Sequence, residues 1–417
     1  MKSDFSRYVP AVAAVFWLCA FISAVIWAFS PSVSPGWDLH VYANAVRSLQ
    51  IGHDPYWDGI AVQRIFHAHL AEHPNAAPPF TYVYSPITLP LLRWLGRFPL
   101  RWVGGMYWLV YGACAAAAMW VGMQAVEPEE RPVFMLLAPA AIFFPGLLEN
   151  DVLFSGNIAY VIYGLVFLTA MIGWRKGQWL WFYLAALAAS CCKAPLLSVL
   201  AIPVLSSRKQ WWQAGVTAVC GVGLFAVQPL LWPAAFQHYL TAVELQFSYN
   251  HDFSCSPAGL LADALYNVIP YTVTSAVFYL VYAVPVFLIL FYLSRRYLDG
   301  EFSLEQWMPV MLAGVILLNP RIMEYDVASI ALPMALLAWR SFARNNSLGK
   351  TILEMSFFCA LLYQFSRTQW RVVECLSLVG LFAAGSWNLY TQVHHAQYRS
   401  RVAATADEET MLVGAQM

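Results

Sequence analysis

Long apolar runs, each separated from the next by a short polar stretch, constrain this chain more than any other feature. The runs recur along nearly all of its 417 residues, of which 60% are hydrophobic and 11% are charged. Soluble proteins average roughly 45–50% apolar and 25% charged residues, whereas a bilayer span needs about 20 consecutive apolar residues. The sequence therefore predicts an all-α, polytopic membrane protein that is surrounded by the lipid bilayer.

The runs predict about ten transmembrane helices in a single domain, residues 1–398, followed by a cytoplasmic tail, residues 399–417. Lys2 and Arg7 precede the first run and favour a cytoplasmic N-terminus, because Lys and Arg concentrate in cytoplasmic segments. Residues 31–85 then form a large periplasmic loop with amphipathic helices, and the chain lies in a bacterial inner membrane. The predicted spans are 9–29, 102–126, 133–149, 152–173, 211–232, 271–294, 307–319, 325–341, 351–366 and 372–391.

Residues 179–205 depart from this pattern, because they form one apolar stretch with basic residues beyond both ends. Arg175-Lys176 and Arg208-Lys209 can both be cytoplasmic only if the stretch enters the membrane and returns. Pro disfavours helix in the residue before it and lacks a donor, so we predict a re-entrant pair of half-helices broken around Lys193-Ala194-Pro195. A charge at membrane depth usually marks function. The alternative is one tilted helix in which Lys193 extends toward the surface.

Polar residues gather in segments that this topology places on the periplasmic side. Asp38 follows the first span closely enough to reach a phosphate at headgroup level, or else it simply N-caps the next helix. Asp54 precedes a proline and suits either a turn or a binding role. Residues 86–100 are too interrupted to span and are predicted to be interfacial. Further clusters are residues 149–157, 250–257 within a predicted 233–270 loop, and 319–326.

The last of these clusters, residues 319–326, places four ionisable side chains between two short apolar runs. Such groups are costly in a membrane unless they line a cavity. We therefore expect them to share one cavity with Asp38, open away from the cytoplasm.

Metal and disulfide sites are not indicated. His69 and His73 are four residues apart and could hold a metal on one helix face, but the spacing fixes no third ligand, and solvated interfacial histidines are the alternative. The eight cysteines are scattered, without disulfide or zinc spacing. No cofactor is predicted, and the net charge of zero gives no reason to expect nucleic acid as a partner.

Taken in order, these residues resemble the landmarks of glycosyltransferase family 87, the polyprenyl-phosphate-mannose-dependent mannosyltransferases with the C-type glycosyltransferase (GT-C) fold. The family has an Asp soon after its first helix, then Tyr-x-x-Ala and Gly-x-Asp-Pro-Tyr, matched by Asp38, Tyr42 to Ala45, and Gly52 to Tyr56. Its Tyr-Pro-Pro, Gly-Gln-x-Asn and Lys-x-x-Pro motifs correspond to Tyr84-Ser85-Pro86, Gly156-Asn157 and Lys193-Ala194-Pro195. Its late Ser-Pro-x-Ser-Trp-(Asp/Glu)-His motif corresponds to Asn319 through Tyr325, where Tyr325 replaces the His. The resemblance spans residues 1 to about 340.

The resemblance implies a hexosyltransferase that uses a polyprenyl-phosphate sugar donor and a glycan or glycolipid acceptor on the periplasmic face. It favours mannose as the hexose, and therefore a mannosyltransferase. Transfer would invert the anomeric centre and need no metal. The resemblance implies Asp38 as the catalytic base. The predicted substrate-binding residues are Asp54, Tyr56, Tyr84, Asn157, Lys193, Arg321 and Glu324, among which Arg321 or Lys193 would stabilise the charge of the leaving phosphate. A lipid-linked sugar flippase or another transporter is the alternative, because such proteins also contain broken helices and intramembrane charges. Transport would place the ionisable groups along a path through the membrane, whereas transfer would concentrate them at one face.

Overall fold

The computed structural model describes residues 36–70, 79–131, 155–250, 254–343 and 371–395, together with residues 14, 15, 18 and 22. Helices connected by turns and loops make up these ranges, which contain no strand, so the predicted all-α class is confirmed. The predicted spans 133–149 and 351–366, nearly all of span 9–29, and the tail 399–417 lie outside the described residues.

Five helices in the described ranges are long and apolar enough to cross a membrane. They match the predicted spans 102–126, 152–173, 211–232, 271–294 and 372–391. In that order they are α5 (Leu100–Met123), α7 (Ile158–Lys176), α10 (Trp211–Ala226) continued by α11 (Gln228–Leu231), α14 (Tyr271–Leu298), and the C-terminal helix Arg371–His395. The architecture is that of a polytopic membrane protein, while the total of ten spans stays a prediction.

Two other predicted spans are shorter than expected. The span predicted at 307–319 is α15 (Leu304–Leu317), whose 14 residues extend about 21 Å at 1.5 Å per residue, against a hydrocarbon thickness of about 30 Å. The span predicted at 325–341 is divided into α16 (Glu324–Ala328), α17 (Ala331–Ala338) and the π-helical turn η4 (Trp339–Ala343). The chain therefore bends beside the cluster of ionisable residues.

The segment 233–270, predicted as a loop between two spans, contains two helices that were not predicted. This segment contains α12 (Pro233–Asn250) and α13 (Pro257–Ala264). Proline occupies the first position of both helices. It is favourable there because a backbone N–H in the first turn has no acceptor within the helix, so the lack of this group in proline costs no hydrogen bond. Ser256 caps α13, because its hydroxyl accepts a hydrogen bond from the Gly259 N–H (3.0 Å). Signals for helix starts were therefore present in the sequence.

Residues 179–206 fold as a hairpin. α8 (Leu180–Cys192) ends at Lys193, whose backbone is extended (φ −142°, ψ 107°), and the chain returns through η3 (Ala194–Leu200) and α9 (Ala201–Ser206). The outer ends meet, because the Tyr183 hydroxyl donates to the Gln210 side chain (2.9 Å) and Trp174 Nε1 donates to Ser206 Oγ (2.8 Å). The break lies where it was predicted, and the alternative of one tilted helix is wrong.

The hairpin geometry predicts that both flanks lie on the same side of the membrane. Single cysteines introduced at Gln178 and Lys209, which are both exposed, should react with a membrane-impermeant maleimide from the same side in intact spheroplasts and inverted vesicles. The unsubstituted chain, which has eight cysteines of its own, measures the background. Labelling of the two positions from opposite sides would contradict a re-entrant hairpin.

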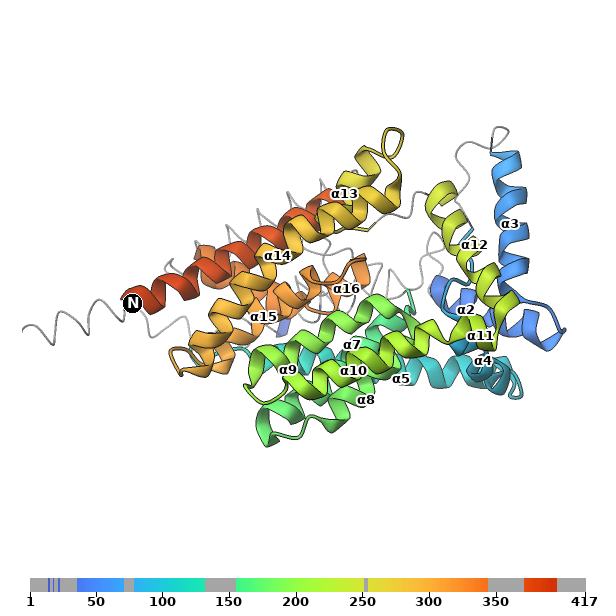
Figure 1. The fold of residues 1–417 in the computed structure, drawn as a ribbon. Coiled ribbons are helices and arrows are strands. Elements are labelled where there is room, and N and C mark those ends of the chain that lie inside the picture. Colours follow the sequence, from blue (N-terminus) through green and yellow to red (C-terminus); the bar gives the residue numbers. More distant parts are fainter. Residues whose placement is uncertain are drawn as a thin grey trace, which may run out of the picture.

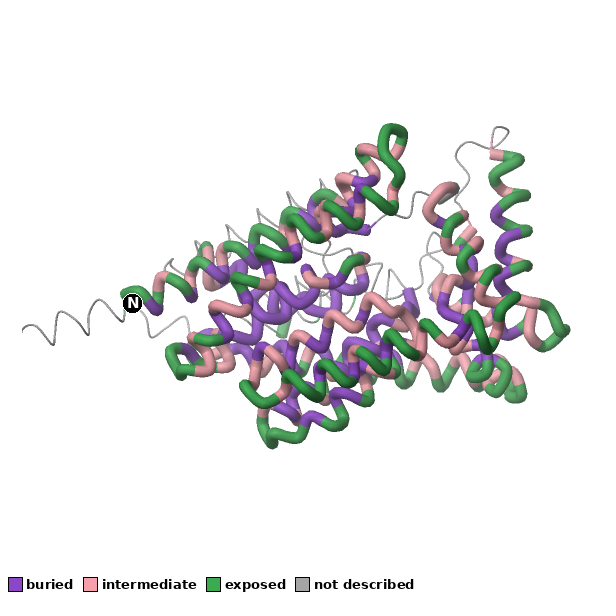
Figure 2. Tube along the Cα trace, in the orientation of Figure 1, coloured by how far each residue is buried: buried purple, intermediate pink, exposed green. Residues whose placement is uncertain are grey.

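The helices pack into two apolar cores. The main core lies among α5, α7, the hairpin, α15, α17 and the C-terminal helix (Figure 2). A Cβ on Gly164 of α7 would lie 2.3 Å from the Cys114 carbonyl oxygen of α5, so these two helices are in backbone contact. On the outer faces, apolar side chains such as Val219 of α10 and Leu280 of α14 are exposed, which suits contact with lipid.

A second, smaller core lies at one end of the molecule (Figure 1). It joins α2 (Trp37–Gln50), α3 (Pro55–His69), α4 (Leu89–Leu95) and α12, and the turn η1 (Pro86–Thr88) packs beside α4 and α12. We call these elements the small helical group. As expected, residues 86–100 contain only short helices that do not span. The candidate site lies where this group meets the main core.

Candidate functional site

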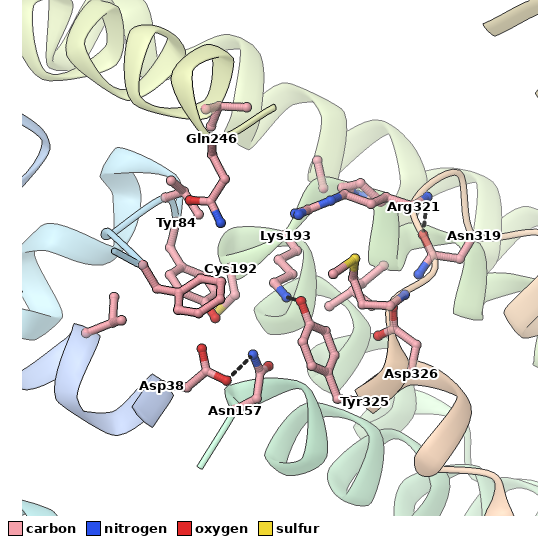
Figure 3. Close-up of a pocket in the computed structure, with 18 of the residues that line it drawn as sticks. Asp38, Tyr84, Asn157, Cys192, Lys193, Gln246, Asn319, Arg321, Tyr325 and Asp326 are labelled. Atoms are coloured by element: carbon pink, nitrogen blue, oxygen red, sulfur yellow. Dashed lines mark hydrogen bonds between the residues drawn. The ribbon is translucent and has the colours of Figure 1, made fainter. Parts of the chain in front are cut away.

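A cavity of about 500 Å³ lies between the small helical group and the main core. Its polar walls come from segments that are far apart in the sequence: the start of α2, the loop before α7, the tip of the hairpin, and the turn between α15 and α16 (Figure 3). Six of the eight predicted site residues line it, namely Asp38, Tyr84, Asn157, Lys193, Arg321 and Glu324. The expectation that the polar clusters converge with Asp38 is met for residues 155–157 and 319–326.

Asp38 lies in the first turn of α2. The helix begins after Gly36, whose φ of 77° is in the left-handed region that favours glycine. The alternative that Asp38 is the N-cap is therefore wrong. Its backbone N–H donates to the Ser155 carbonyl (3.0 Å), and its Oδ2 accepts a hydrogen bond from Asn157 Nδ2 (3.0 Å). The helix dipole favours a carboxylate in this first turn.

The loop before α7 fits closely against the start of α2. Gly156 has a φ of 71°, and a Cβ there would lie 3.3 Å from Leu39 Cβ and 3.5 Å from Gly36 Cα. The Tyr107 hydroxyl donates to the Gly156 carbonyl (2.6 Å). The span predicted at 152–173 begins only at Ile158, because Asn157 is the N-cap of α7. This capping keeps residues 155–157 in the loop beside Asp38.

Two tyrosines, Tyr42 and Tyr84, lie near Asp38. The hydroxyls of Tyr42 and Tyr84 share a hydrogen bond of 2.8 Å, and the Tyr42 hydroxyl accepts a second one from the Ile158 N–H (3.0 Å). Burial raises the pKa of Tyr84 well above its usual range, and the negative charge of Asp38 raises it further. Tyr84 therefore faces the cavity as a neutral hydrogen-bonding group.

Lys193 reaches the cavity from the tip of the hairpin. Its Nζ donates to the Tyr325 hydroxyl (3.0 Å) and lies 4.3 Å from the centre of the Tyr325 ring and 5.4 Å from that of Tyr84, distances at which a cation is attracted to an aromatic face. The Ser85 hydroxyl donates to the Cys191 carbonyl (2.8 Å) and ties the tip to the small helical group. Tyr325, which stands where the motif of the resembling family has His, thus contacts the half-buried Lys193 cation.

Arg321 enters from the turn between α15 and α16. Ser254 holds this turn, because its hydroxyl donates to the Ile322 carbonyl (2.9 Å) and accepts from the Ile322 N–H (2.8 Å). The Arg321 N–H donates to Asn319 Oδ1 (3.0 Å). Its guanidinium lies 5.3 Å from the ring centre of Phe247 on α12. A second cation is thereby fixed on the cavity wall.

Asp54 and Tyr56 do not line the cavity, although they were predicted to bind substrate. Asp54 caps α3 by accepting from the Tyr56 N–H (2.9 Å), and its Oδ2 contacts His238 Nδ1 on α12 (2.8 Å). Tyr56 is fully buried, and its hydroxyl donates to the Tyr84 carbonyl. Their contacts hold α3, α12 and the chain at Tyr84 together, so both residues support the cavity wall from outside.

Of the two histidines weighed as metal ligands, His69 and His73, only His69 lies within the described residues. The His69 Nδ1 lies 2.8 Å from the Ile65 carbonyl one helical turn earlier. Among the described residues, no group of three or more possible metal ligands is found.

Several cavity residues were not singled out from the sequence, including Tyr239 and Gln246 on α12 and Arg371 at the start of the C-terminal helix. α12 lies within the predicted 233–270 loop, for which no helix was predicted, so its side chains had no predicted direction. For Arg371 a signal existed in the sequence. It directly precedes a predicted span, at the end that the predicted topology assigns to the periplasmic side, where a positive charge is unusual.

The cavity combines groups for two chemical tasks. Asp38 can accept a proton, whereas Lys193 and Arg321 can stabilise negative charge on a bound group.

In comparisons with known proteins, no family model matches the chain, and no curated protein matches it significantly. The grounds for assigning a function are therefore the residues of the site and the motif resemblance.

Proposed function

We propose that this protein is a membrane glycosyltransferase that moves a hexose from a polyprenyl-phosphate donor to a hydroxyl of a glycan or glycolipid acceptor. The motif resemblance favours mannose as the hexose. The observation that carries the proposal is the presence of Asp38, Lys193 and Arg321 in one cavity of about 500 Å³, a volume within the usual range for ligand sites. Residues of the 31–85 loop, which is predicted to be periplasmic, line the cavity, and this supports our proposal that the reaction takes place on the periplasmic face of a bacterial inner membrane.

In the proposed reaction, the acceptor hydroxyl attacks the anomeric carbon from the face opposite the phosphate. A new carbon–oxygen bond forms, the bond from the anomeric carbon to the phosphate oxygen breaks, and the configuration inverts. Asp38 takes the hydroxyl proton. The phosphate leaves with the bonding electron pair, and Lys193 and Arg321 stabilise its charge.

The apolar wall of the cavity suits the isoprenoid chain of such a donor. Its aromatic residues Phe80, Phe225 and Phe247 come from the segment before Tyr84, from α10 and from α12. α10 also exposes apolar side chains on its outer face. A prenyl chain could thus pass from this wall toward lipid while its phosphate stays beside the cations.

The broken hairpin would also suit a transporter, but the distribution of charge favours transfer. In the described part of the chain, the lining of one cavity contains six residues with ionisable side chains, three acidic and three basic: Asp38, Glu324, Asp326, Lys193, Arg321 and Arg371. The largely buried Arg340 lies elsewhere, where it pairs with Glu130 (2.7 Å) and donates to the carbonyls of Ala125 and Glu305 (both 2.9 Å). These contacts give Arg340 a structural role.

Membranes that contain the protein should transfer label from radioactive polyprenyl-phosphate-mannose to a glycan or glycolipid acceptor. Membranes from cells without the protein provide the control. If no polyprenyl-phosphate hexose supports transfer, and purified protein instead moves lipid-linked sugars across reconstituted vesicles, the transporter alternative is correct.

Transfer is expected to persist in EDTA, because fixed cations and not a bound ion would stabilise the leaving phosphate. The measurement is the initial rate of label transfer by dialysed membranes with and without chelator. Loss of transfer in EDTA followed by recovery with manganese would contradict this prediction and return attention to His69 and His73.

A further inference from the structure

The start of α7 determines how the Asn157 side chain meets Asp38. An asparagine amide has an accepting end, the oxygen, and a donating end, the NH₂ group. At Asn157 the oxygen accepts the capping hydrogen bond from the Ala159 N–H (2.9 Å). Because a backbone N–H can be met only by the oxygen, the NH₂ group must point the other way, where Asp38 Oδ2 lies 3.0 Å from Nδ2 (Figure 3).

The surroundings allow the Asn157 side chain little freedom. Only 2% of the residue is exposed, and its backbone N–H donates to Ser155 Oγ (3.0 Å). The Ser155 carbonyl in turn accepts from the Asp38 N–H (3.0 Å). The loop before α7 therefore contacts Asp38 at two places, the backbone N–H of Asp38 and its side-chain carboxylate.

We infer that Asn157 is a positioning residue for Asp38, the base of the proposed reaction. The side-chain oxygen of Asn157 caps α7, and its NH₂ group is therefore directed toward the Asp38 carboxylate. The predicted role of Asn157 in binding substrate stays a prediction, and the bearing of the positioning role on catalysis rests on the proposed function. A hydrogen bond donated to a carboxylate favours the charged form. Asp38 can take a proton only in that form, so Asn157 extends the activity of the base toward lower pH.

Three substitutions separate positioning from capping. Asn157→Ser and Asn157→Asp both keep an oxygen that can cap α7, but both lose the NH₂ donor, whereas Asn157→Ala loses the cap as well. Asn157→Asp also places a second carboxylate opposite Asp38. If capping were the only role, Ser and Asp would behave like Asn, and only Ala would be impaired.

For Asn157→Ser we expect kcat to fall about 10-fold, with KM little changed. The pH below which activity is lost should be higher, because loss of the hydrogen-bond donor makes Asp38 easier to protonate. For Asn157→Asp the loss should be larger and the movement roughly one pH unit. Profiles that coincide with that of the unsubstituted protein would overturn the inference.

A second measurement does not depend on transfer. Dicyclohexylcarbodiimide reacts with protonated carboxyl groups, so the fraction of Asp38 modified at each pH, measured by mass spectrometry of its peptide, reports protonation directly. We expect the midpoint to be higher in Asn157→Ser and Asn157→Asp than in the unsubstituted protein. If the midpoint moves but no sugar is transferred, the proposed function fails and the positioning role stands. If sugar is transferred and the midpoint does not move, the positioning role fails.

Discussion

Asp38→Asn is expected to reduce sugar transfer by roughly 10²–10⁴-fold, the usual contribution of a general base. The Asn side chain keeps the size of Asp, and its oxygen can still accept the hydrogen bond from Asn157 that Asp38 accepts now. Because Gly36 is the N-cap of α2, the substitution removes no helix cap. Protein yield and retention of the donor by purified protein should therefore be unchanged, and the initial rate of label transfer measures the loss.

Asp54→Asn is the matched control for this experiment. It makes the same chemical change at a carboxylate that caps α3 outside the cavity, and Asn is as good an N-cap as Asp. We expect it to keep most of the activity. If Asp38→Asn retained more than half of the turnover while Asp54→Asn were inactive, the base would lie at the start of α3.

Lys193→Met is expected to lower the rate of transfer by roughly 10²–10³-fold, as removal of one group that stabilises developing negative charge does in other enzymes. Met is similar in length and apolar, so it can occupy the same space beside the Tyr84 and Tyr325 rings, which Lys193 contacts now. The loss should appear in kcat measured with saturating donor, because charge on the phosphate grows as the bond breaks.

Two variants make the test of Lys193 specific. Lys176→Met makes the same substitution at an exposed lysine at the end of α7 and should have no effect. Lys193→Arg keeps the charge but changes its shape, so we expect partial activity. A lower thermal midpoint for Lys193→Met together with an unchanged rate would show that Lys193 acts only in the packing of the hairpin.

The elements that were predictable are those whose signal is local. Apolar length predicts α5, α7, α10 and α14, because a bilayer imposes one length on any span. The hairpin was predictable because basic residues flank it on both sides and Pro195 breaks it. α12 was not predicted, although Pro233 is a local signal for its start. Its contacts, including the one between His238 and Asp54, depend on how distant segments pack.

In the site, too, some features were predictable from the sequence, whereas others depend on the packing of distant segments. Topology alone placed residues 155–157 and 319–326 on the side of Asp38, and the structure brings these segments into one cavity. Asp54 and Tyr56 were assigned to substrate through a motif resemblance, although an Asp before a proline is also a local signal for a helix start. Their real partners, His238 and the Tyr84 carbonyl, depend on how distant segments pack, which no local pattern specifies.

The hairpin also has a consequence for biosynthesis. α8 has 13 residues and extends about 20 Å, so neither arm can cross a bilayer alone, and η3 and α9 rest on α15. The ribosome must add the 97 residues 207–303 after the hairpin before α15 begins at Leu304, which takes roughly 5–20 s at 5–20 residues per second. During that interval Lys193 has no Tyr325 to contact, and we expect the nascent chain to need an insertase to shield the unfinished hairpin from lipid.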